Sequence, residues 1–94
     1  MLAVRQFDKS AGRDGAAPKP ALKPSSSNVL IGGQKPMLLG DYWNAHRRGK
    51  HTHSMKCIQG SNNVLVNGNP LVYTTANLSC GDMAAQGCST VTVN

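Results

Sequence analysis

The three histidines, His46, His51 and His53, are the residues of this 94-residue chain best suited to bind a metal ion. Imidazole nitrogens are common metal ligands. In His51-Thr52-His53, side chains of an extended backbone alternate, so the two imidazoles point to the same side. These residues alone support a solvated basic loop equally well, because several cations surround the histidines: Arg47, Arg48, Lys50 and Lys56.

The three cysteines, Cys57, Cys80 and Cys88, cannot all pair within one chain, and no two of them form a CxxC motif. We therefore expect no disulfide scaffold. Cys57 follows His53 closely and is an alternative metal ligand, although its place beside Ile58 and before a turn favours a small buried hydrophobic residue. Cys88 is expected to be a packed turn residue.

Groups that could catalyse a reaction are scarce, because the chain has no glutamate and only four acidic residues. Asp41 and Asp82 have no second carboxylate nearby in the sequence, so turn formation explains them better than acid–base catalysis. Ser61 and Ser89 have no histidine placed locally as a base. We expect no enzymatic activity.

The composition also limits the possible partners. A net charge of +6 leaves nucleic acid, anionic lipid and acidic proteins open. The chain has no Arg-rich helix or lysine run, so no nucleic acid is expected. No apolar run approaches the roughly 20 residues that cross a bilayer, and we expect no secretory signal peptide. Trp43 and Tyr42 should shield a thin core rather than anchor in a membrane or stack on bases.

Three similar segments must position these residues, and each predicts a short strand. Residues 27–36 read SNVLIGGQKP, residues 62–70 read NNVLVNGNP, and residues 89–94 read STVTVN as a truncated third copy. Their β-branched residues alternate and should face one side. Gly32-Gly33 and Asn67-Gly68 predict tight hairpins, because these residues accept the positive φ of a type I′ turn. The sequence therefore predicts an all-β fold.

The first 24 residues mix Ala, Gly, Pro and isolated charges without a helical or strand period. We interpret residues 1–24 as a basic extended tail, disordered on its own and held by another chain. Residues 25–94 would form the domain. The histidines lie in its first connection, at residues 40–60, and Cys80 lies in the second, at residues 77–87.

The repeat resembles that of the PAAR-repeat proteins, small conical tips on the trimeric spike of contractile injection machines such as phage tails and type VI secretion systems. The resemblance covers about residues 25–94 and rests on the two hairpin copies, on Gly40-Asp41 and on Cys80-Gly81. The chain departs from the family at the namesake Pro-Ala-Ala-Arg, where residues 36–39 read PMLL and residues 70–73 read PLVY. It also lacks Gly-Asp after the second copy and the opening Gly-Asp loop with its histidine.

The resemblance implies a small conical fold of three pseudo-repeated hairpins and strands with one metal ion near the apex. Family members use three histidines and one cysteine as ligands, which corresponds here to His46, His51, His53 and Cys80. Imidazoles and a thiolate in a four-coordinate shell favour zinc, with iron as the other candidate. The metal would be structural and would tie the loops together at the tip.

The implied function is mechanical. The chain would cap and sharpen the trimeric β-helical spike of a phage tail baseplate, one monomer per trimer, and help to pierce the target cell envelope. It would belong to the virion, contact the target outer membrane transiently, and use its tail to contact baseplate or spike chains. A type VI secretion tip, made in the bacterial cytoplasm and then secreted with the spike, is the nearest alternative.

Two further interpretations come from other classes of protein. In a homotrimeric spike, the His-x-His pairs of three chains would bind a single iron ion, giving one third of a metal per chain and no role for Cys80. A small basic nucleic-acid-binding module would instead lose affinity steeply as salt rises.

Overall fold

The computed structural model describes residues 1–12, 17–25, 28–48, 51–79 and 81–93. This part of the chain is all β, as predicted, and contains no helix that could span a membrane. Its strands are β1 (Leu2–Ala3), β2 (Ala21–Lys23), β3 (Tyr42–Arg48), β4 (His51–Lys56), β5 (Leu65–Val66), β6 (Asn69–Pro70) and β7 (Cys88–Thr92).

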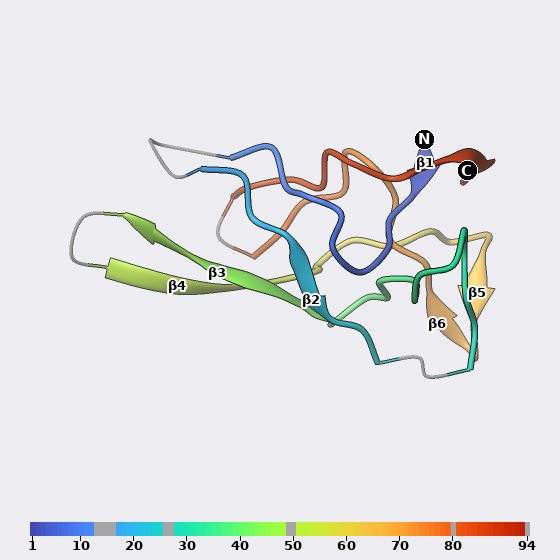
Figure 1. The fold of residues 1–94 in the computed structure, drawn as a ribbon. Helices are drawn as coiled ribbons and strands as arrows, with labels where there is room; N and C mark the ends of the chain where they lie inside the picture. Colours follow the sequence, from blue (N-terminus) through green and yellow to red (C-terminus); the bar gives the residue numbers. More distant parts are fainter. Residues whose placement is uncertain (13–16, 26–27, 49–50, 80, 94) are drawn as a thin grey trace.

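The strands form three small antiparallel sheets, ordered β1-β7, β2-β3-β4 and β5-β6. The molecule is elongated, with extents of 37 × 23 × 21 Å. The β3–β4 hairpin projects from one end, while β5, β6 and the paired β1 and β7 lie toward the other end (Figure 1). The longest strands therefore carry the predicted histidine connection away from the predicted hairpins.

Both predicted hairpin turns are confirmed. Gly32 and Gly33 have φ values of 57° and 82°, and Asn67 and Gly68 have φ values of 52° and 83°. Positive φ at both central residues is the signature of a type I′ turn, whose twist matches that of the flanking strands. In the first hairpin, Ile31 N–H donates to Gln34 O at 2.7 Å.

The predicted alternation of the three repeat strands is also confirmed. Leu30 and Leu65 lie at the intervening positions and are 63% and 57% exposed. The alternate β-branched residues pack into one cluster with Ala3, Leu38 and Leu71. They are Val29, Ile31, Val64, Val66, Val91 and Val93. Because every second side chain is buried, strands that are far apart in the sequence share one core.

The interpretation of residues 1–24 as a separate, disordered tail is wrong. Ala3, Val4 and Ala21 are fully buried, and β1 pairs with β7 in the register Leu2↔Thr92. Val93 N–H also donates to Met1 O at 2.7 Å, matching the Ile31–Gln34 bond. The start of the chain thus supplies the return strand that the truncated third copy lacks. The buried residues of this segment are scattered singly along it, so its sequence shows no helical or strand period.

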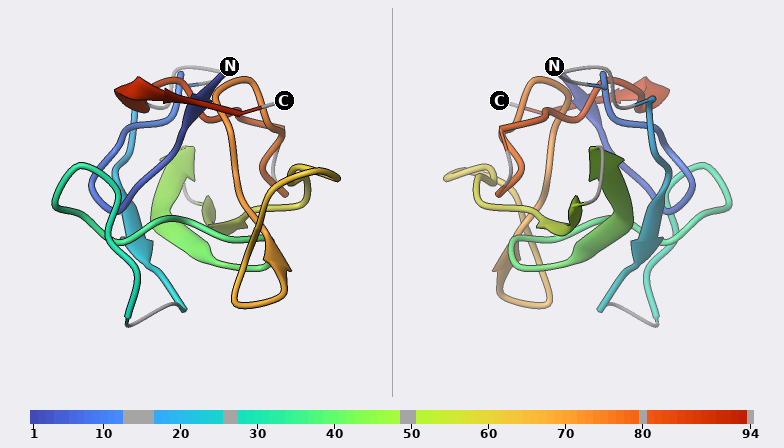
Figure 2. Two further views of the ribbon diagram at one scale, coloured as in Figure 1. Left: turned by 90° about the vertical axis from the view of Figure 1, so that its right-hand side faces the viewer. Right: turned by 90° about the vertical axis from the view of Figure 1, so that its left-hand side faces the viewer.

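A closed ring of three hydrogen bonds joins the copies. Val4 N–H donates to Val72 O at 3.0 Å, Val72 N–H to Met37 O at 2.9 Å, and Met37 N–H to Val4 O at 2.9 Å. All three residues are fully buried in one core cluster. The left view of Figure 2 shows the segments β1–β7, 28–36 and β5–β6 arranged around this centre. Three segments of a single chain therefore meet through equivalent bonds at one buried centre.

A tight turn follows each member of the ring. Asp8 N–H donates to Arg5 O, Asp41 N–H to Leu38 O, and Ala76 N–H to Tyr73 O, over 2.9 to 3.1 Å. The residue before the donor has a positive φ in every case, and these residues are Phe7, Gly40 and Thr75. Each of them donates its N–H to a returning segment, at Ala21 O, Cys57 O and Ala84 O respectively. Each turn thus begins a segment of the chain that leaves the ring and later returns beside the turn. We call these segments the first, second and third excursions.

Candidate functional site

The second excursion is the β3–β4 hairpin, and its backbone carries the three histidines. The register pairs His46 directly with His53, whereas His51 pairs with Arg48. Directly opposed residues of an antiparallel pair have Cβ atoms about 4.5–5.5 Å apart. The side chains of residues 45–54 lie outside the described part of the molecule. The fold therefore brings two of the predicted ligand positions together at the level of the backbone.

Cys80, the fourth predicted ligand, lies outside the described residues, but the preceding residues are placed. Leu78 forms a β-bridge with Cys57. Ser79 N–H donates to Lys56 O at 2.9 Å, and its hydroxyl accepts from Lys56 N–H at 3.1 Å. The third excursion thus runs beside the base of β4. A strand rise of about 3.3 Å per residue puts this contact about 10 Å from His53.

Residues 1–12, 17–25, 28–44, 55–79 and 81–93, whose side chains are described, contain no group of three or more histidine, cysteine or acidic side chains that could hold a metal ion. The predicted ligand set falls on the remaining residues. The sequence prediction for His46, His51, His53 and Cys80 therefore stays a prediction, supported by the His46–His53 register alone.

Cys57, the alternative ligand, is a core residue. Its side chain is buried in the cluster with Trp43, Met55 and Leu78. Burial raises the pKa of the Cys57 thiol strongly, and the nearby Asp41 carboxylate raises that pKa further. A thiol held in its neutral form is a poor metal ligand, because metals bind the thiolate. The preferred interpretation of Cys57 as a small buried hydrophobic residue is confirmed.

The other cysteine and the aromatic residues divide between core and surface. Cys88 is buried at the start of β7, with its Sγ 3.3 Å from Thr90 Oγ1. Trp43 is buried, as predicted, and its indole Nε1 has no hydrogen-bond partner among the described atoms. Tyr42 is exposed instead, because it lies on the opposite face of β3. Shielding of the core therefore rests on Trp43.

The described carboxylates act on the backbone. Asp41 Oδ2 accepts from Leu38 N–H at 2.8 Å and from Ser25 N–H at 3.1 Å. Asp8 Oδ2 makes the equivalent 2.8 Å bond with Arg5 N–H. Asp82 Oδ1 accepts from Gly12 N–H at 3.0 Å. The prediction that Asp41 stabilises a turn is confirmed, whereas the buried Asp82 links two distant segments through Gly12. Asp8 is a turn-stabilising carboxylate that the sequence prediction missed.

The end opposite the β3–β4 hairpin is a second candidate site. The exposed Leu30 and Leu65 occupy equivalent positions in the first and second hairpins, and each is more than half exposed. The β1–β7 pair with its exposed Met1 is the third element around the same centre. Leu30 and Leu65 thus expose apolar side chains at this end, whereas the equivalent position of β7 is the polar, exposed Thr92. No protein-family model matches the sequence, and no curated protein matches it significantly.

Proposed function

We propose that the chain is a PAAR-like tip that caps the trimeric spike of a contractile injection machine. The observation that carries this proposal is the cyclic ring of Val4, Met37 and Val72, which gives one chain three equivalent edges. A trimeric β-helix ends in three equivalent edges of its own. A single chain with internal threefold pseudo-symmetry can contact all three spike chains in the same way.

The opening segment of the chain adds support for this family. Residues 3–8 read AVRQFD and turn in the same way as residues 36–41. The family pattern has Ala-Ala-Arg, a hydrophobic residue and Gly-Asp at these places, so Ala3, Arg5 and Asp8 match it, whereas Phe7 replaces the glycine. Residues 3–8 thus resemble part of the family's repeat.

In this proposal, Leu30, Leu65 and the β1–β7 pair pack against the end of the spike. Burying two leucines that are more than half exposed would contribute about 1 kcal/mol or more for each side chain. The spike would thus extend a core that is thin in a chain of this length.

The opposite end would be the point of the tip. His46, His51, His53 and Cys80 would hold one structural metal ion there, zinc in preference to iron. The imidazole and thiolate donors fit this ion, and the opposed positions of His46 and His53 suit a shared ligand shell. Closed coordination would tie the β3–β4 hairpin to the segment after Ser79, where mechanical load arrives first.

We favour the baseplate tip of a phage tail, in the virion, over a type VI secretion tip. In either machine the tip would help to pierce the envelope of the target cell. The homotrimeric iron-binding spike is a weaker candidate, because the copies already complete their ring within one chain.

Mixing the purified chain with a trimeric β-helical spike protein from the same source tests the capping function. We expect a complex of one tip per three spike chains by native mass spectrometry. Leu30→Asp and Leu65→Asp should abolish it, whereas Ile58→Asp, which changes an exposed residue outside the hairpins, should leave it intact. Equal binding by all variants would contradict the proposed docking face.

Elemental analysis tests the metal site separately. We expect one zinc or iron ion per chain, lost or weakened in Cys80→Ser and retained in Cys57→Ser. Metal that is indifferent to Cys80→Ser and lost in Cys57→Ser would overturn the ligand assignment.

A further inference from the structure

Phe7 is an exposed aromatic residue in an unfavourable backbone conformation. Its φ is 76°, and its side chain is 56% exposed. The equivalent position in the second turn is Gly40, the residue type that this conformation favours. The third turn has Thr75 at this position with a φ of 81°, so the turn imposes the conformation, and Phe7 is the bulkiest of the three residues that adopt it.

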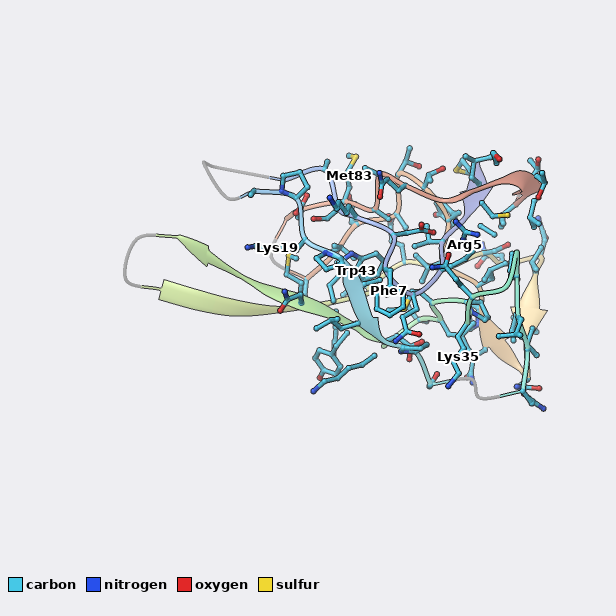
Figure 3. All side chains as sticks on the ribbon, viewed as in Figure 1. Arg5, Phe7, Lys19, Lys35, Trp43 and Met83 are labelled. Carbon is cyan, nitrogen blue, oxygen red and sulfur yellow. The ribbon has the colours of Figure 1, made fainter. Side chains whose placement is uncertain are left out.

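Around Phe7 lie apolar and basic residues, which are exposed except for the half-buried Lys19 and Lys35. Phe7 N–H donates to Ala21 O, and Ala21 immediately precedes the exposed Leu22 of β2. Figure 3 shows Phe7 between Lys19 and Lys35, in front of β2. We call this surface the Phe7 face, and its members are Phe7, Leu22, Lys9, Lys19, Lys23 and Lys35.

No acidic side chain among the described residues compensates the charge of the Phe7 face. Its lysines have no ion-pair partner among the described residues, where Arg5–Asp8 is the one salt bridge, at 3.2 Å. The described carboxylates, Asp8, Asp41 and Asp82, are all buried. The electrostatic potential of this face therefore favours the approach of a negatively charged partner.

The backbone beside Phe7 is already hydrogen-bonded. Ala21 donates to Asp8 O and accepts from Phe7 N–H, both at 2.8 Å, while Leu22 O accepts from Gln6 Nε2 at 3.1 Å. The edge of β2 is thus closed to an added peptide strand. Recognition falls to an aromatic ring, an aliphatic chain and ammonium groups on flexible stems, which is the combination that suits a lipid headgroup region.

We propose that the Phe7 face binds the surface of an anionic lipid bilayer, with Phe7 and Leu22 inserted among the headgroups and the four lysines contacting lipid phosphates. This proposal goes beyond the spike tip function, since it requires neither the spike nor the metal. It assigns a lipid contact to the side of the molecule rather than to its point.

Vesicle sedimentation tests this proposal. The full chain should bind phosphatidylcholine vesicles that contain phosphatidylglycerol, should not bind phosphatidylcholine alone, and should dissociate as salt rises. Phe7→Gly, which adopts the residue type of Gly40, should weaken binding about tenfold, and Leu22→Ser should act in the same direction. Lys9→Gln and Lys23→Gln should each weaken binding about fivefold.

Two variants serve as matched controls, because they change exposed residues of the same types elsewhere: Lys56→Gln and Ile58→Ala. Both should bind vesicles like the wild type. Equal weakening by the lysine variants and by Lys56→Gln would overturn the Phe7 face as the site. Absence of vesicle binding, combined with binding to soluble polyglutamate, would overturn the lipid proposal in favour of an acidic protein partner.

Discussion

At the residue scale, buried carboxylates replace the backbone partners that long strands would provide. Asp41 is buried and accepts two backbone N–H groups, from Leu38 and Ser25. Asp8 does the same for Arg5 in the first turn, whereas the third turn has Ala76 at this position. Three related turns therefore differ in how their N–H groups are satisfied.

Asp41→Ala should lower the free energy of unfolding by about 2 kcal/mol, because it leaves buried N–H groups without an acceptor. Asp41→Asn keeps one oxygen and should cost about 1 kcal/mol. Urea unfolding measures both, with Asn44→Ala, an exposed change on β3, as the control. A loss no larger for Asp41→Ala than for Asn44→Ala would show that these bonds contribute nothing.

Cys57 should make the stability of the protein depend on alkaline pH. Burial raises its pKa in the folded state, so the folded chain keeps this proton while the unfolded thiol ionises near its ordinary pKa of about 8.5. The stabilisation that the neutral Cys57 thiol provides is complete below that pH. Above it, the free energy of unfolding falls by about 1.4 kcal/mol per pH unit. Urea unfolding from pH 7 to 10 should show a shallower decline for Cys57→Ala. Parallel pH curves for the two proteins would contradict a buried neutral thiol.

At the element scale, local turn chemistry was sufficient to predict the two hairpins and the faces of their strands. Gly32-Gly33 and Asn67-Gly68 predict the two turns, and the alternation of β-branched residues predicts which face of each strand is buried. The packing of the opening segment could not be predicted in this way, because Ala3 and Val4 are buried by segments distant in sequence. The opposition of His46 and His53 also depends on register, which shifts between Trp43 and His46. The sequence identified histidines as candidate ligands, but it did not show which of them lie opposite one another.

Gly60 marks a close approach between the segment that leads into the second copy and Pro70 at the end of that copy. A Cβ atom at this position would lie 2.6 Å from Pro70 Cβ and 3.2 Å from Pro70 O. Gly60→Ala should therefore cost about 2 kcal/mol, because the proline ring and backbone cannot move aside without strain. Gly33→Ala is the control, since a Cβ there meets no atom within 4 Å and only its positive φ costs about 1 kcal/mol. Thermal unfolding should rank the variants in this order, and the reverse order would contradict the packing.

At the scale of the whole molecule, the copies close on themselves. The backbone N–H and C=O groups of Val4, Met37 and Val72 bond to one another in a ring. Strand β1 completes the third copy by pairing with β7. A chain with this internal closure has no need of two further copies to complete its threefold arrangement. This closed ring within one chain supports our proposal of a single-chain tip over that of a homotrimeric spike.

Native mass spectrometry of the purified chain tests this claim most directly, because one spectrum reports both the number of chains and the number of metal ions. We predict the mass of one chain plus one zinc or iron ion. A stable trimer that carries a single metal ion would contradict the single-chain tip and would favour a homotrimeric spike built on the His-x-His pair.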